Sequence, residues 1–376
     1  MTASSQRDRL EALARHSVAV IQDNQAPSGA YIASPNFAVY RYSWLRDGAF
    51  IADAMSRAGQ AASAEAFFTW CSRILVARAS RIDSLIARHR SGQPIAEDEF
   101  LHARYTVDGE EVPDEWWNFQ LDGYGTWVWA LGAHLRRTPG CTVDPYRDGV
   151  VLSTRYVIEF WAEPSYDWWE EYVGHRHTST LAPLYAGLQE AAQWASLPTG
   201  LRRQAGEAAG EIRRTVLSQG RQNGHLVKWL GGDAVDASLI ACGVPFGLVS
   251  SSDPLMTATV RAVESSLAHG GVHRYLEDTY YGGGEWLLLS ALLGWHYASV
   301  GRLDAARAQL AWILEHATQD GDLPEQVADH LLAPGARQKW IDRWGPVATP
   351  LLWSHAMFLT LALELGELTP PITPAR

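Results

Sequence analysis

The segment Tyr166–Glu171 reads YDWWEE and places two adjacent carboxylates directly after a pair of tryptophans. It precedes a stretch near residues 177–195 whose apolar residues recur with helical spacing. A second segment, Leu323–Gln326 (LPEQ), places another carboxylate in a loop between two expected helices. Aromatic neighbours exclude water and thereby raise the pKa of an adjacent acid. Because clusters of aromatic and acidic residues are also common at ordinary surfaces, these two segments alone leave a solvated surface role open.

Two carboxylates in different environments are what the hydrolysis of a glycosidic bond requires, since one must be protonated and the other ionised. The segments Tyr40–Asp47 (YRYSWLRD) and Arg274–Trp286 (RYLEDTYYGGGEW) add aromatic residues interleaved with arginine and carboxylates. Aromatic planes cover the apolar faces of sugar rings, and charged side chains bind the hydroxyl groups. The four segments together predict a carbohydrate site.

In this order, the four segments resemble glycoside hydrolase family 15, the glucoamylase family. This family also contains glucodextranases, isomaltose glucohydrolases and a branch of bacterial trehalases. Two further segments, Gln120–Gly125 (QLDGYG) and Trp353–Ala356 (WSHA), extend the resemblance over about residues 40–356. It implies an enzyme that removes glucose from the non-reducing end of an α-glucoside with inversion of configuration.

The resemblance assigns the general acid to Glu170, which follows Trp169, and the general base to Glu325. The pair Arg46 and Asp47 would bind the non-reducing glucose, and Tyr40 would help to hold the attacking water. The other residues placed around the sugar are Trp44, Trp116, Gln120, Trp169, Glu171, Arg274, Asp278 and Trp286. The competing carboxylates are Glu277, Asp278 and Glu285. The alternative for each aromatic residue is core packing, and for Arg46–Asp47 a structural ion pair.

Two features depart from the family pattern, and the second of them would border the leaving sugar. Leu276 stands where fungal members often have proline, and Tyr172–His177 replaces a basic residue often found soon after the acid. The linkage preference is therefore open.

Helical spacing dominates the chain and strand alternation is scarce. Long connections fall at 24–45, 92–120, 163–176, 220–234, 269–284 and 318–348, and every chemical segment lies in or beside one of them. This alternation predicts an all-α (α/α)6 barrel of twelve helices whose long loops surround a pocket at one end. The expected helices are near 6–23, 46–59, 61–90, 121–137, 144–162, 177–195, 198–219, 235–241, 253–268, 285–300, 302–317 and 349–365.

Composition restricts the class of protein. The chain has 376 residues, of which 47% are hydrophobic, so a large buried core is expected. The net charge of -11 argues against nucleic-acid binding. An uninterrupted apolar run of about 20 residues is absent, so no spanning helix is expected. The N-terminus lacks a signal-like apolar region, and three widely spaced cysteines, Cys71, Cys141 and Cys242, indicate reduced thiols, so we expect a cytoplasmic location.

Motifs for other chemistries are missing from the sequence. It has neither a His-Glu-x-x-His motif nor a cysteine pair, and Gly282–Gly284 follows no expected strand. We therefore expect no cofactor and no catalytic metal. We further expect residues 1–376 to form a single catalytic domain without a carbohydrate-binding module.

These expectations favour a short oligosaccharide as substrate, and among these an α-1,6-linked, isomaltose-type sugar. A maltooligosaccharide glucoamylase and a trehalase are the alternatives within the family. A non-catalytic sugar-binding barrel, a lyase and a phosphorylase are the alternatives from other classes. A phosphorylase needs a basic phosphate site, for which Arg337, Lys339 and Arg343 are candidates.

Overall fold

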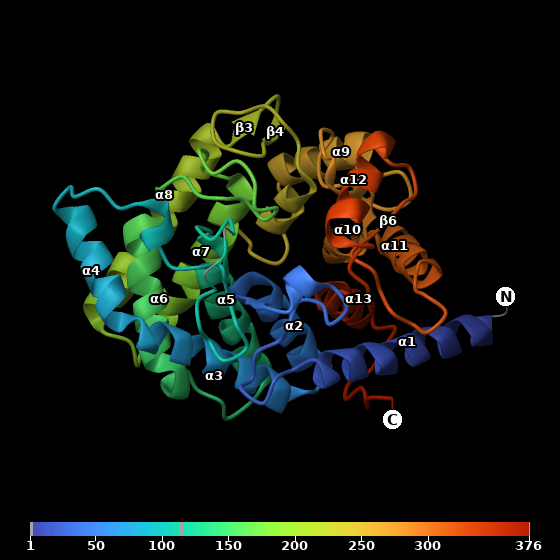
Figure 1. Ribbon diagram of the computed structural model, residues 1–376, viewed down its shortest axis with the longest axis horizontal. Coiled ribbons are helices and arrows are strands. Elements are labelled where there is room, and N and C mark those ends of the chain that lie inside the picture. Colours follow the sequence, from blue (N-terminus) through green and yellow to red (C-terminus); the bar gives the residue numbers. More distant parts are fainter. Residues whose placement is uncertain (1–2, 113, 115, 376) are drawn as a thin grey trace.

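A computed structural model describes residues 3–112, 114 and 116–375 of the chain, and its long elements are all helices (Figure 1). Twelve of these elements form two concentric layers. They are α1 (Ala3–Asp23), α2 (Leu45–Arg57), α3 (Ala61–Ala77), α5 (Asp122–Arg137), α6 (Arg147–Phe160), α7 (Thr178–Gln193), α8 (Thr199–Gln219), the 3-10 helix η4 (Ala237–Cys242), α9 (Pro254–Leu267), α10 (Leu287–Ser299), α11 (Leu303–Glu315) and α13 (Leu352–Glu364).

The inner layer is a closed ring. In order, α2 packs on α5, α5 on α7, α7 on η4, η4 on α10, α10 on α13, and α13 returns to α2. The outer elements α1, α3, α6, α8, α9 and α11 pack on α13, α2, α5, α7, η4 and α10, respectively. The predicted (α/α)6 barrel of twelve helices is therefore confirmed.

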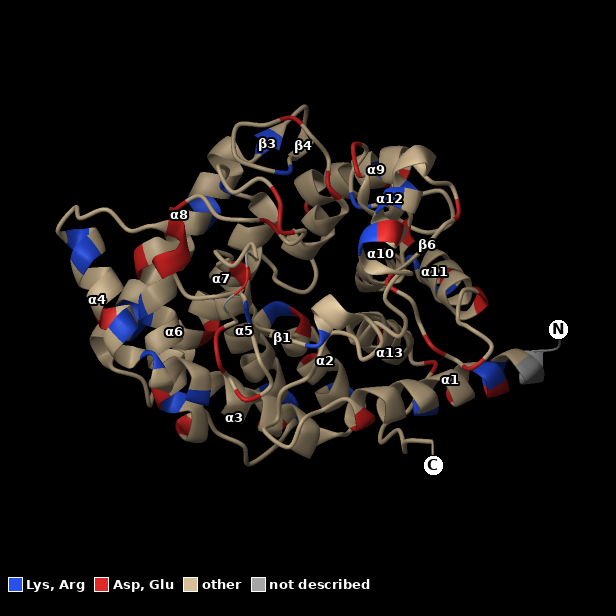
Figure 2. Cartoon of the chain, in the orientation of Figure 1, with Lys and Arg blue, Asp and Glu red and all other residues tan. Residues whose placement is uncertain are grey.

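The two layers differ in sequence because they differ in burial. Every residue of the inner helix α10 from Leu287 to Tyr297 is buried, and the helix contains no Asp, Glu, Lys or Arg. A helix that is apolar on all sides is stable only inside a protein. The charged residues lie mainly on the peripheral helices, including α4 (Ala79–Arg90) and α8 (Figure 2).

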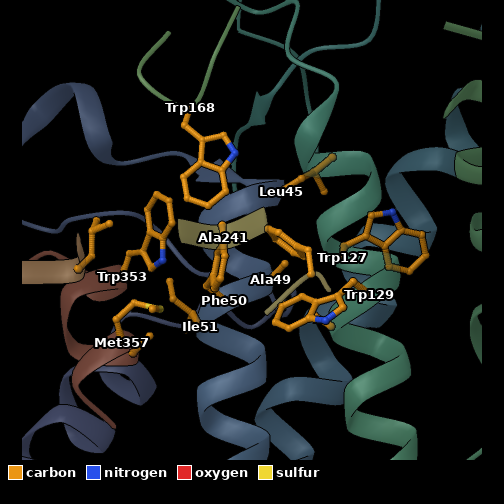
Figure 3. Packing of buried hydrophobic residues seen from close by; sticks show 14 of the residues in the cluster. Leu45, Ala49, Phe50, Ile51, Trp127, Trp129, Trp168, Ala241, Trp353 and Met357 are labelled. Carbon is orange, nitrogen blue, oxygen red and sulfur yellow. The ribbon is translucent and has the colours of Figure 1, made fainter. Parts of the chain in front are cut away.

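Large aromatic side chains fill the centre of the barrel (Figure 3). The Phe50 ring of α2 stacks on Trp353 of α13, with centroids 5.1 Å apart, and meets the edge of Trp168 at 5.9 Å. Trp129 of α5 lies 5.7 Å from the same phenyl ring. These residues join three inner helices to the loop that follows α6.

Two expected helices differ from those in the structure, and one helix was not expected. The single helix expected over 61–90 is divided into α3 and α4 at Arg78, whose side chain instead donates hydrogen bonds to Glu111 and to the Gly109 carbonyl. The element expected at 235–241 is the 3-10 helix η4. An additional helix, α12 (Pro334–Trp344), lies inside the connection expected at 318–348. The other helices begin and end within a few residues of their predicted limits.

Short strand pairs fix the long loops at one end of the barrel. Strand β1 (Ser43–Trp44) pairs with β2 (Arg104–Tyr105), and β5 (Glu285–Trp286) pairs with β6 (Gln326–Val327). A third pair, β3 (Arg221–Gln222) and β4 (His225–Leu226), forms a hairpin after α8. Strands β1 and β5 lead directly into α2 and α10, so they position residues at the start of these inner helices. Among the described residues, no helix has both the length and the apolar character needed to cross a bilayer.

Candidate active site

A cavity of about 170 Å³ lies among the long loops, where the inner helices α2 and α13 begin. Residues that line it include Ala33, Tyr40, Trp44, Arg46, Asp47, Trp116, Trp117, Trp168, Trp169, Glu170, Glu171, Arg274, Tyr280, Trp286, Glu325, Trp340, Trp344, Leu351 and Trp353.

The structure brings most of the site residues predicted from sequence to this one cavity. Two of them stand just behind it: Gln120 contacts Arg46 and Glu170, and Asp278 binds Arg274. The competing carboxylates Glu277 and Glu285 do not line this cavity. Glu277 is exposed, and the Glu285 carboxylate is buried against the backbone N–H of Gly271.

The Glu170 carboxylate is held through one of its two oxygens. Trp44 Nε1 donates a hydrogen bond of 2.7 Å to Oε1, and Gln120 Nε2 donates one of 3.0 Å to the same atom. The backbone of Glu170 has φ 65°, a left-handed conformation that is costly for a residue with a side chain. Such strain persists only where surrounding contacts fix the loop.

Those contacts come from a buried ionic cluster behind the acid loop. Asp167 Oδ1 accepts hydrogen bonds of 2.9 Å from the backbone N–H groups of Trp169 and Glu171. Lys228 Nζ lies 3.0 Å from Asp236 Oδ2 and 3.4 Å from Asp167 Oδ2, and the Trp169 indole donates to Asp236 at 2.9 Å. Burial raises the pKa of Asp167 to about 6, although Lys228 opposes this shift. The cluster therefore fixes the backbone on both sides of Glu170.

Glu325 lines the same cavity in a drier environment than Glu170, with only 2% of its surface exposed. Tyr40 donates a hydrogen bond of 3.0 Å to Glu325 Oε1, and the Tyr280 hydroxyl lies 2.9 Å from the Tyr40 hydroxyl. Burial raises the pKa of Glu325 to about 8, while the hydrogen bond from Tyr40 and the charge of Arg274 act in the opposite direction.

Replacing Tyr40 by phenylalanine is expected to move the acid limb of the pH–activity profile to higher pH. A base works only when ionised, so activity is lost as the pH falls through the pKa of Glu325. The Tyr40 hydroxyl stabilises the ionised form, and its removal raises that pKa further. The measurement is kcat/KM against pH. Tyr281→Phe is the matched control because its hydroxyl binds the Gly345 carbonyl. A limb that stays in place or moves to lower pH contradicts this assignment.

Arg46 and Asp47 lie together at the start of α2. Arg46 Nη1 donates hydrogen bonds of 2.9 Å to both Gln120 Oε1 and Asp122 Oδ2, and its Nε is 3.6 Å from Asp47 Oδ2. Burial raises the pKa of Asp47 to about 7, opposed by Arg46. Within the described part of the chain, Arg46 Nε and Asp47 Oδ2 are buried without a hydrogen-bond partner. Both groups can therefore bind sugar hydroxyls.

Arg274 supplies a second fixed cation. Its Nε donates a hydrogen bond of 2.8 Å to Asp278 Oδ2, and its Nη2 binds the other oxygen of that carboxylate. The guanidinium lies 5.2 Å from the ring centroids of both Trp169 and Trp286. A forked pair between aromatic rings has little freedom, so Arg274 presents a fixed charge to the cavity.

Aromatic residues from α12 complete the entrance of the cavity. Trp340 and Trp344 lie one helical turn apart, with ring centroids 5.0 Å from each other. Trp344 stacks on Trp116 at 6.3 Å, and Trp116 lies 5.1 Å from Trp117. We call these four tryptophans the entrance tryptophans.

Several of these residues were not predicted from the sequence. Trp340 and Trp344 were missed with their helix, although Pro334 at its first position is a usual start signal. Lys228 and Asp236 both lie in the loop between β4 and η4, whereas Asp167 lies in the loop after α6. The only local signal was a lysine within an apolar stretch. Tyr280 lies within the segment Arg274–Trp286, but no role was predicted for it.

A family model described as Glycosyl hydrolases family 15 matches residues 7–340. The chain belongs to glycoside hydrolase family 15. The isomaltose glucohydrolase of Kribbella flavida is 48% identical over 365 residues, which cover 96% of this chain and 94% of that protein. A solved wild-type glycosidase has a TM-score of 0.95 at 47% identity, covering 98% of this chain and 100% of its own. A variant glycosidase with the same values was solved in complex with glucose.

Membership in glycoside hydrolase family 15 confirms the resemblance and makes the chain a glycoside hydrolase. More distant members include a trehalase of Thermoplasma acidophilum, 26% identical over 80% of this chain. The chain spans about half of that trehalase, since the match covers 55% of it. A bacterial glucoamylase solved with acarbose, at 19% identity and a TM-score of 0.73, shares the fold.

Proposed function

We propose that this family 15 enzyme is an inverting exo-α-glucosidase that releases β-glucose from isomaltose and other short α-1,6-linked oligosaccharides. The observation that carries the proposal is the 48% identity to an isomaltose glucohydrolase along nearly the whole of both chains. The cavity is lined by both Glu170 and Glu325, which agrees with a glucose unit bound between an acid and a base. A cytoplasmic location, a single catalytic domain and the absence of nucleic-acid partners stay predictions.

The proposed acid is Glu170. Because Trp44 and Gln120 both bind Oε1, the proton resides on Oε2 and is transferred to the glycosidic oxygen. The anomeric carbon then acquires oxocarbenium character as the bond to the leaving sugar breaks. The buried ionic cluster behind the acid loop holds this carboxyl group in one position.

The proposed base is Glu325. Its Oε1 accepts from Tyr40, while Oε2 has no hydrogen-bond partner among the described residues and is the atom that takes the proton from water. The water attacks the face of the sugar opposite to Glu170, so the product is β-glucose. Inversion requires the two carboxyl groups to be about 6.5–9.5 Å apart.

Exo-action follows from the closed inner end of the cavity. Trp168 and Trp353 line the cavity and pack on Phe50 in the barrel core, so a longer chain cannot pass through. Arg46 and Asp47 would bind the hydroxyls of the terminal glucose. The leaving sugar then lies against the entrance tryptophans, where the extra rotatable bond of an α-1,6 linkage changes its path.

The test of the proposal is a comparison of kcat/KM for isomaltose, maltose, trehalose and soluble starch, with the first anomer of glucose read by proton NMR. We expect the highest value for isomaltose, a poor reaction with starch, and β-glucose first. A higher kcat/KM for maltose than for isomaltose indicates a glucoamylase. A higher kcat/KM for trehalose than for isomaltose indicates a trehalase. If α-glucose appears first, inversion is wrong. Binding of isomaltose without turnover indicates a non-catalytic barrel.

A phosphorylase finds little support in the arrangement of basic residues. Lys339 is exposed, and Arg343 lies over the rings of Trp340 and Trp344, 5.7 Å and 4.6 Å from their centroids. Neither these two residues nor Arg337 lines the described cavity. A rate that is independent of phosphate concentration is expected.

Replacing Asp47 by alanine is expected to lower kcat/KM for isomaltose about 30- to 150-fold. This corresponds to about 2–3 kcal/mol for a charged hydrogen bond lost from a closed site. The control is Asp304→Ala, since Asp304 is a fully exposed carboxylate in the first turn of the outer helix α11. An unchanged kcat/KM in Asp47→Ala would mean that the Arg46–Asp47 pair is only structural.

A further inference from the structure

A second group of chemically reactive side chains lies on the side of the barrel. Glu65 of α3, His134 in the last turn of α5 and Cys141 in the loop after α5 each direct one donor atom to a common point. These donor atoms all lie within 4.8 Å of one another. His134 is twelve residues after Asp122, so the group lies about 18 Å along α5 from the catalytic end. It is separate from the catalytic site.

The distances from Glu65 to the other two donors match those around a tetrahedral metal ion. His134 Nε2 and Glu65 Oε1 are 3.4 Å apart, and Cys141 Sγ and Glu65 Oε1 are also 3.4 Å apart. Zinc bonds of about 2.0–2.3 Å at tetrahedral angles separate two donors by about 3.3–3.7 Å. The combination of sulfur, imidazole nitrogen and carboxylate oxygen is also a donor set that zinc accepts.

The His134 ring is held in the orientation that a ligand needs. It is fully buried, and its Nδ1 lies 2.9 Å from Ser56 Oγ. With the ring proton on Nδ1, the Nε2 lone pair faces Glu65 and Cys141, as in sites where a second hydrogen bond fixes a metal-binding histidine. Among the described residues, Nε2 is buried and has no hydrogen-bond partner.

The charges around the group are compatible with a cation. The nearby Arg137 guanidinium is neutralised by the buried Asp53. Glu65 and Cys141 are only half-buried, so an ion can reach them from solvent.

We propose that Glu65, His134 and Cys141 bind a zinc ion that links the outer helix α3 to the inner helix α5. The three side chains leave a fourth tetrahedral position, which water would fill. On binding, the Cys141 thiol loses its proton to solvent and ligates as a thiolate. The ion would join two layers of the barrel, so its role is structural rather than catalytic.

The experiment uses the native full-length enzyme and Zn²⁺ alone. Cys71 and Cys242 are fully buried, so a thiol reagent applied to the folded protein reports on Cys141. We expect Zn²⁺ to slow this modification at least tenfold and to raise the Tm. With Co²⁺ instead, we expect the near-ultraviolet absorption band of a thiolate-bound cobalt ion.

The variants Glu65→Gln and Cys141→Ser each replace a half-buried side chain by one of nearly the same size. In both, we expect loss of the zinc-induced rise in Tm and unchanged turnover of isomaltose without added metal. His89→Gln is the matched control, because His89 contacts Glu159 and Glu163 but no cysteine, and it should respond to Zn²⁺ like the wild type.

Two results would overturn the proposal. The first is a thiol modification rate that Zn²⁺ does not change, together with no cobalt–thiolate band. The second is a rise in Tm that persists in both Glu65→Gln and Cys141→Ser, which would place the bound ion elsewhere. Neither result bears on the glucosidase activity.

Discussion

Replacement of Glu170 by glutamine is expected to lower kcat for isomaltose about 10²- to 10⁴-fold. The amide has nearly the same size and can still accept the hydrogen bonds from Trp44 and Gln120, but it cannot give a proton to the glycosidic oxygen. The sugar hydroxyls keep their partners, so KM should change much less than kcat. The measurement is steady-state hydrolysis of isomaltose, with the Tm as a check of folding.

A substrate with a good leaving group makes this assignment sharper. An α-glucosyl fluoride or a nitrophenyl α-glucoside needs little protonation of its leaving group, so Glu170→Gln should lose far less rate on it than on isomaltose. Glu277→Gln is the matched control, since Glu277 is an exposed carboxylate on a loop near the site. Near-normal turnover of isomaltose by Glu170→Gln would move the acid to Glu171. An equal loss on both substrates would argue for a structural defect instead.

Replacement of Glu325 by alanine is expected to abolish measurable hydrolysis of isomaltose, with a loss of about 10²- to 10⁴-fold or more. Glu325 is buried, lines the cavity and would activate the water. Sodium azide should restore part of the turnover, because this anion attacks without a base and fits the space left by the shortened side chain. The product would be β-glucosyl azide.

The stereochemistry of the rescued product separates the possible roles of Glu325. A β-azide places the removed carboxylate on the face opposite to the leaving sugar, as expected of an inverting base. An α-azide would instead require two displacements through a glycosyl–enzyme intermediate, which would identify Glu325 as the acid/base of a retaining enzyme and contradict inversion. Gln326→Ala is the control for loss of local structure, since Gln326 lies next to Glu325 and its side chain accepts from the Gly284 N–H.

The main features of the fold could be predicted because the inner helices have a strong signature. The stretches that became α10 and α13 are apolar on all sides, which only a buried helix tolerates. Helix α12 lacks any buried residue and is rich in polar side chains, so its periodicity was too weak to detect. The inner element η4 was predicted as an ordinary helix but is a 3-10 helix. All six of its residues are buried, so their apolar pattern has no period that distinguishes a 3-10 helix from an α-helix.

The candidate site divides in the same way. Arg46, Asp47, Glu170 and Glu325 were predicted because each stands in a short segment whose order along the chain matches a family. Lys228 acts through contacts with Asp167 and Asp236 that join the loop before η4 to the loop after α6, and such an arrangement leaves no pattern in any one segment. Contacts of this kind become visible only when the barrel has brought the loops together.

Closure of the inner ring determines when this enzyme can first recognise a sugar during its synthesis. Helix α2 emerges early from the ribosome, yet one of its neighbours in the ring is α13, which is made last. Until α13 docks, the apolar face of α2 lacks this partner and the cavity lacks Trp353. Contacts between residues about 300 positions apart are slow to form, and the unfinished barrel exposes apolar surface meanwhile. Nascent chains would therefore depend on chaperone protection until the final inner helix has been translated.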